Sequence, residues 1–143
     1  MINPPMRSPR EKVGGLYHFG RMLDKIRLHL RGEFPGEYKP NFGVDDGLDG
    51  LLAQFLGLTH DEIVPRARKG GTDADILEWC FARGLRPNET QIAIWNGFAG
   101  KIGWRDRAAT TVEKVREQSG RSDIATIFDC IDASEGRLAP ASS

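Results

Sequence analysis

The sequence contains only two cysteines, Cys80 and Cys130, and they lie fifty residues apart. This spacing excludes a zinc-type cysteine cluster, and two isolated thiols are typical of free cysteines in a reducing compartment. No apolar run approaches the ~18 residues of a membrane-spanning helix. The start, MINPPMRSPREK, has no apolar core of a secretory signal. We therefore expect a cytoplasmic protein with no membrane segment.

The chain also lacks an excess of charge of either sign, because Lys+Arg and Asp+Glu number 20 each. Balanced charge argues against nucleic-acid binding, since such binding needs a basic surface. The charges are nevertheless unevenly distributed. Residues 1–31 carry a net charge of +5, and residues 32–64 carry −6. This asymmetry indicates either contacts between neighbouring elements or attraction of a charged partner.

Strand patterns and internal repeats are absent, and apolar residues recur with the period of a helix. Residues 16–30, for example, place six apolar residues within an arc of ~120°: Leu16, Phe19, Met22, Leu23, Ile26 and Leu30. Capping-box patterns begin at Thr59 and Asn88, among others, and Ser122 is expected to cap the last helix. A helix over about residues 89–102 is apolar around more than a third of its circumference, so we expect it at the centre.

These patterns predict an all-α, compact bundle of six or seven short helices with no sheet. The length of 143 residues fits one domain. We expect a single α-helical domain over residues 1–138 and a disordered C-terminal tail over residues 139–143.

Several known functional motifs are present only in part. Gly15 and Gly20 have the spacing of a phosphate-binding loop, but Arg21 and Met22 replace its Lys and Ser or Thr. The aspartates of residues 45–50 resemble a calcium loop without its final glutamate. No zinc-protease motif and no nucleophile elbow is present. We therefore expect no metal, no cofactor and no recognisable catalytic residue, and whether the protein is an enzyme stays open.

One group of residues indicates a binding surface. His18, Arg21, Lys25 and His29 share an arc of about 80° on the helix predicted over residues 16–30. Together with neighbouring residues they give the following candidate binding set: Arg7, Arg10, Lys12, Tyr17, His18, Arg21, Lys25 and His29. One interpretation is a solvated basic face paired with the acidic turn at residues 45–49. The other is a site for an anion or an acidic protein surface.

Three hypotheses on function follow. The leading one is a small binding or interaction protein that engages an anionic ligand or acidic partner through its basic N-terminal region. The alternative is a small enzyme that uses His18 as acid or base while Arg21 and Lys25 hold an anionic substrate. That alternative requires a pocket around His18 with a second polar cluster opposite. The third is a structural or oligomerisation module, although the sequence leaves the oligomeric state undetermined.

Two long strings, RSPREKVGGLYHFGRMLDKIR and SDIATIFDCIDASEGR, and the WNGF of Trp95–Phe98 resemble one known family. It is a family of short, mostly bacterial proteins described as domain of unknown function 5069. The resemblance runs from about Arg7 to Arg137. It implies one intact domain, and it carries no assigned activity, cofactor or catalytic residue.

Overall fold

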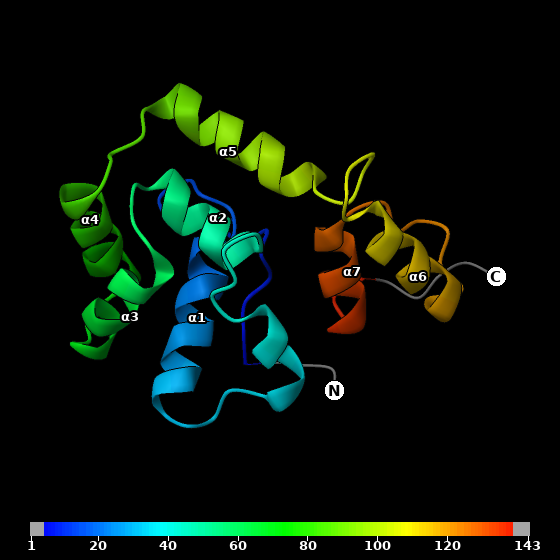
Figure 1. The fold of residues 1–143 in the computed structure, drawn as a ribbon, viewed down its shortest axis with the longest axis horizontal. Coiled ribbons are helices and arrows are strands. Elements are labelled where there is room, and N and C mark those ends of the chain that lie inside the picture. The colour runs from blue at the N-terminus through cyan, green and yellow to red at the C-terminus, as the bar shows by residue number, and fades with distance from the viewer. Residues whose placement is uncertain (1–4, 139–143) are drawn as a thin grey trace.

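Seven α-helices and one 3-10 helix account for the regular structure of residues 5–138, which the computed structural model describes (Figure 1). Their bounds are α1 (Phe19–Leu30), η1 (Gly36–Asn41), α2 (Leu48–Phe55), α3 (His60–Arg68), α4 (Asp73–Arg83), α5 (Glu89–Lys101), α6 (Ala109–Ser119) and α7 (Ile127–Ser134). No strand occurs among these residues. The prediction of an all-α bundle is confirmed, whereas the predicted tail at 139–143 lies outside the described residues.

Capping boxes begin four of the helices, and the cap residues are Thr59, Thr72, Asn88 and Thr126. In each box the cap side chain accepts the N–H three residues on, whose side chain accepts the cap N–H in return. The predicted cap at Ser122 is wrong, because α7 begins after Thr126. Ala125 follows Ser122 by three residues and has no acceptor, whereas Asp129 completes the box of Thr126.

The core forms around α1. The predicted apolar face is buried there: Leu16, Phe19, Met22, Leu23 and Ile26 are completely inaccessible to solvent. They pack in one cluster with side chains of α2, α3, α4 and α7, including Leu52, Ile63, Ile76 and Phe128. Gly20 lies inside α1, where a Cβ atom would stand 2.9 Å from the guanidinium carbon of Arg7. The glycine spacing therefore reflects close packing of the N-terminal segment on a helix.

The expectation that α5 lies at the centre is wrong. It runs along the outside of the molecule, across the top of Figure 1. Only Trp95 and Ala99 are buried, whereas Ile94 is 63% exposed and Phe98 is 45% exposed. The reason is that one side of α5 alone meets the rest of the chain. Its apolar circumference is wider than the surface available to cover it.

The structure has two parts that α5 connects (Figure 1). We call residues 5–83, which include α1 to α4, the N-terminal lobe, and α6 with α7 the C-terminal hairpin. The hairpin has a small core of its own around Val112, Ile124 and Cys130. Phe128 of α7 packs edge-on against Tyr17, with 5.5 Å between ring centroids. Within the described range, no helix has the length and apolar character that crossing a membrane requires.

Candidate functional site

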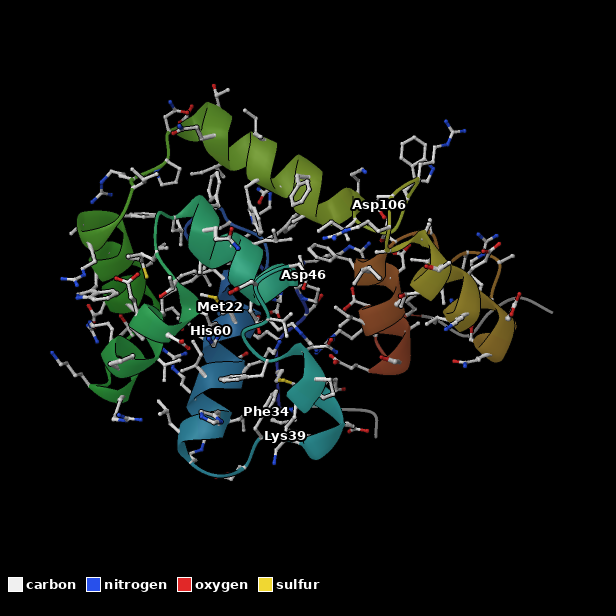
Figure 2. The ribbon with its side chains drawn as sticks, viewed as in Figure 1. Met22, Phe34, Lys39, Asp46, His60 and Asp106 are labelled. Carbon is white, nitrogen blue, oxygen red and sulfur yellow. The ribbon has the colours of Figure 1, made fainter. Side chains whose placement is uncertain are left out.

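A cavity of about 800 Å³ lies between the N-terminal lobe and the C-terminal hairpin. Apolar side chains from α2, α5, α6 and α7 form much of its lining: Leu48, Leu51, Phe98, Ile102, Val115, Ile127 and Ile131. Figure 2 shows two acidic lining residues, Asp46 before α2 and Asp106 between α5 and α6. The side of the cavity next to α1 is polar, because the residues that line it there are His18, Arg21 and Lys25.

Two of these residues share one carboxylate. His18 Nε2 lies 2.7 Å from Asp49 Oδ1, and Lys25 Nζ donates to Asp49 Oδ2 at 2.6 Å. The Gly43 N–H also donates to Oδ2, and Lys25 Nζ donates to the Asn41 carbonyl oxygen. His18 is 2% exposed, Asp49 1% and Lys25 5%. We call His18, Lys25 and Asp49 the Asp49 cluster.

The protonation of the Asp49 cluster follows from its surroundings. Burial lowers the pKa of His18 from its ordinary 6.5, against the raising effect of Asp49 and with support from the Lys25 and Arg21 cations. Burial alone would raise the pKa of Asp49, but His18, Lys25 and the Gly43 N–H together hold it below its usual range. At neutral pH a neutral His18 therefore faces a carboxylate, so its proton is on Nε2. The other nitrogen, Nδ1, is left unprotonated, and no hydrogen-bond partner for it exists in the described structure.

The backbone of His18 is also unusual. Its φ of 71° and ψ of −17° lie in the left-handed region, which few residues other than glycine adopt. The conformation is held on both sides, because the His18 N–H donates to Pro9 and the His18 carbonyl accepts from Met22. Asn96 of α5 accepts from the Tyr17 N–H at 2.9 Å. Strained backbone that several contacts fix in place is typical of functional sites.

A second buried ionic group lines the same cavity. Arg21 donates to both oxygens of Glu135 at 2.8 and 2.6 Å, and the Tyr38 hydroxyl donates to Glu135 at 3.0 Å. Arg137 donates to the same carboxylate. Glu135 is 1% exposed. We call these four residues the Glu135 cluster, in which each carboxylate oxygen accepts two hydrogen bonds.

Comparison with protein families gives a match over nearly the whole chain. The model of a family described as Domain of unknown function (DUF5069) matches residues 3–137. The chain belongs to this family. A search among curated proteins found no match. Because the DUF5069 description names no activity, the function of this chain has to be inferred from its geometry.

This DUF5069 chain brings only part of the predicted binding set together. His18, Arg21 and Lys25 line the cavity, but His29 is exposed and packs against Phe42 with 4.6 Å between ring centroids. The interpretation of a solvated face is therefore wrong for the three buried residues. The predicted pairing with the acidic turn at 45–49 is confirmed at Asp49.

The remaining members of the set have other contacts. Arg7 pairs with Asp24 and Asp73, and Arg10 pairs with Asp129 and Asp132. The exposed Lys12 lies over the ring of the half-buried Tyr17, with its Nζ 5.3 Å from the ring centroid. These four residues are absent from the cavity lining, and three of them, Arg7, Arg10 and Tyr17, bind the N-terminal segment to the rest of the fold.

Both cysteines of this DUF5069 chain are buried free thiols. Burial raises the pKa of Cys80 to about 11, and burial together with the Asp129 carboxylate raises the pKa of Cys130. Cys130 lines the cavity, but a protonated thiol is a poor nucleophile. Over residues 5–138, no three His, Cys, Asp or Glu side chains are grouped so as to hold a metal ion.

Proposed function

We propose that this DUF5069 protein binds a small amphipathic organic molecule in the cavity between its two parts, with the polar group of that molecule against His18. One observation carries the proposal, namely the unpartnered Nδ1 of a histidine that is 2% exposed and lines the cavity. A buried acceptor without a partner costs about 1–3 kcal/mol. A ligand that donates a hydrogen bond to Nδ1 recovers that free energy.

The size and lining of the cavity support a ligand of this kind. Small-molecule sites typically occupy about 300–1,000 Å³ and combine apolar walls with a few polar groups. The cavity, of about 800 Å³, falls within this range. Lys25 Nζ carries three hydrogens and donates to two acceptors, Asn41 and Asp49, so one donor remains for a ligand acceptor. A head group with both a donor and an acceptor matches this wall.

The balance of charge favours an uncharged head group over the anion that the basic residues suggested. Arg21 and Lys25 are already paired with Glu135 and Asp49. Asp46 and Asp106 add two acidic groups to the lining, and Arg107 adds one basic group. An acidic protein surface is disfavoured too, because His18, Arg21 and Lys25 are all buried.

A series of primary amides of four to ten carbons tests the proposal, with the carboxylates of equal length for comparison. Each amide has an N–H donor and a carbonyl acceptor on an apolar chain. We expect the amides to raise the Tm more than the carboxylates do, with an effect that grows with chain length. His18→Asn should abolish the amide effect, whereas His29→Asn, the same change at the exposed end of α1, should retain it. Equal effects in the two variants, or none in the wild type, would refute the proposal.

A further inference from the structure

We infer that His18 acts as a general base that activates water for the hydrolysis of an uncharged carboxylic ester with an apolar acyl chain. The inference rests on the proposed function, because the ester has to occupy the cavity between the N-terminal lobe and the C-terminal hairpin. It goes further by assigning chemistry to the histidine.

The arrangement of His18 is that of an oriented base. One nitrogen is fixed by the Asp49 carboxylate at 2.7 Å, and the other has no partner. A carboxylate in this position holds the imidazole in one tautomer and stabilises the imidazolium that forms when the base accepts a proton. The lowered pKa of His18 keeps Nδ1 unprotonated at neutral pH. Asp49 is thus a positioning residue, and Lys25 and the Gly43 N–H fix its second oxygen.

Water, and not a side chain, is the nucleophile in this inference. A serine, threonine or cysteine nucleophile would stand within hydrogen-bond reach of the base. Nδ1 of His18 has no such partner in the described part of the chain. Cys130 lines the cavity as a protonated thiol, and the Ser134 hydroxyl donates to the Ile131 carbonyl at 3.0 Å. Neither residue is prepared for attack.

The same wall has a donor for the charge that develops on the carbonyl oxygen. Lys25 retains one N–H after its bonds to Asn41 and Asp49, and it lines the cavity beside His18. Donors that are fixed before the reaction stabilise such an oxyanion strongly. The apolar side chains of α2 and α7, among them Leu51 and Ile127, provide the surface for the acyl chain.

The reaction conserves atoms and electrons. The water oxygen bonds to the carbonyl carbon while a water proton passes to Nδ1, and the π electrons of the carbonyl move onto its oxygen. The carbonyl then reforms as its bond to the alcohol oxygen breaks, and the imidazolium returns the proton to that oxygen. Ester and water become carboxylic acid and alcohol, and His18 is regenerated.

The probes are the 4-nitrophenyl esters of acetate, butyrate and hexanoate with the full chain. We expect hydrolysis above the buffer rate, with kcat/KM rising from acetate to hexanoate. His18→Asn should lower kcat roughly 10²-fold, the lower end of what a general base contributes, with little change in KM. Asparagine suits this position, because it tolerates the left-handed backbone and is a good helix N-cap. His29→Asn should match the wild type.

Two further measurements separate a base from a merely structural histidine. Leu51→Ala should raise KM for the hexanoate ester more than for the acetate ester, while kcat is retained. The rate should be retained at pH 6.5 and fall only at lower pH, because burial lowers the pKa of His18 below its ordinary 6.5. The charged groups that act on His18 are Asp49 from α2 and Lys25 and Arg21 from α1.

The outcomes are distinct. Hydrolysis that is unchanged in His18→Asn, or an acyl group trapped on the histidine and seen by mass spectrometry, would overturn the general-base inference. If the amide series binds but no ester is hydrolysed faster than in buffer, the inference fails and the proposed function stands. If neither amides nor esters bind, both fail.

Discussion

The Asp49 cluster and the Glu135 cluster both contribute to the cavity lining, and in both the carboxylate is only 1% exposed, yet they differ in one respect. In the Glu135 cluster, both carboxylate oxygens accept two hydrogen bonds each. In the Asp49 cluster the carboxylate is also fully engaged, but His18 keeps one nitrogen without a partner. The carboxylate of the Glu135 cluster is therefore saturated with hydrogen bonds, whereas the Asp49 cluster has a ring nitrogen without one. Of the two clusters, only the Asp49 cluster leaves a buried ring nitrogen for another molecule to bind.

The two clusters also connect different parts of the chain. Arg21 and Glu135 are 114 residues apart in the sequence, and their ion pair joins α1 to the residue that follows α7. The Asp49 cluster lies entirely within the N-terminal lobe. We therefore regard the Glu135 cluster as one of the contacts that hold the C-terminal hairpin in place, together with the ion pairs of Arg10, and the Asp49 cluster as the part of the wall that the proposed function uses.

The largest expected effect is on stability when the Glu135 cluster is broken. Arg21→Met leaves a buried carboxylate without its main partner and should lower the free energy of unfolding by about 3–5 kcal/mol. Urea unfolding measures this change. The control is Arg31→Met, because Arg31 pairs with Glu33 on the surface, where a pair contributes about 0–1 kcal/mol. A loss at Arg21 no larger than the loss at Arg31 would show that the Glu135 cluster does not hold the hairpin.

A smaller effect is expected when the Asp49 cluster loses its histidine. His18→Asn removes one hydrogen bond, while Asp49 keeps Lys25 and the Gly43 N–H. The free energy of unfolding should fall by only about 1 kcal/mol. The same urea measurement would contradict this view of the two clusters if His18→Asn cost as much as Arg21→Met.

Much of the fold could be predicted because its signals are local. A capping box joins residues three apart, so Thr59, Thr72 and Asn88 mark helix starts wherever the rest of the chain lies. The apolar face of α1 could be read from its helical period. The exposure of α5 could not, since it depends on which elements cover each of its sides. The left-handed residue His18 follows Gly14 and Gly15, which end the preceding turn and signal an irregular backbone there.

The candidate site, like the fold, could be predicted only in part from the sequence. Helical spacing placed His18, Arg21 and Lys25 on one face, and that face does line the cavity. Their partners were harder to find. Asp49 belongs to a visible acidic run, but its burial depends on how α2 packs. Glu135 has no local signal, because its partner is 114 residues away. Periodicity alone could not show that these cations are buried, since burial of a charge requires a partner that spacing does not identify.

The pH dependence of stability should separate the two clusters. The pKa of His18 and that of His60 are lowered by burial, so between pH 6.5 and the lowered values the unfolded chain binds more protons than the folded one. Stability is therefore complete above about 6.5 and falls as the pH decreases, by up to about 1.4 kcal/mol per pH unit for each histidine. His18→Asn should make this fall shallower.

The carboxylate of Glu135 affects stability at a lower pH than the two histidines do. The pKa of Glu135 lies below its ordinary 4.5, because its hydrogen bonds to Arg21, Arg137 and Tyr38 outweigh the effect of burial. Its contribution is present above 4.5 and is lost as the pH falls further. Urea unfolding between pH 7.5 and 3.5 should thus show two regions. A single decline that begins below pH 4.5, and that His18→Asn does not change, would contradict the assignment to His18.

The smallest expected effect is on thiol reactivity, and it reports on the hairpin without changing the fold. Cys80 and Cys130 are both buried with raised pKa, so an aromatic disulfide reagent should label them slowly in the native protein and rapidly after unfolding. They differ in location, because Cys80 belongs to the core around α1 and Cys130 lies on α7 and lines the cavity.

If the Glu135 cluster holds the hairpin, Arg21→Met should accelerate labelling of Cys130 and leave labelling of Cys80 slow under conditions where the variant stays folded. His18→Asn should change neither rate. Parallel acceleration of both cysteines in Arg21→Met would indicate general unfolding, and the Glu135 cluster would then be part of one cooperative core and not a separate contact between two parts.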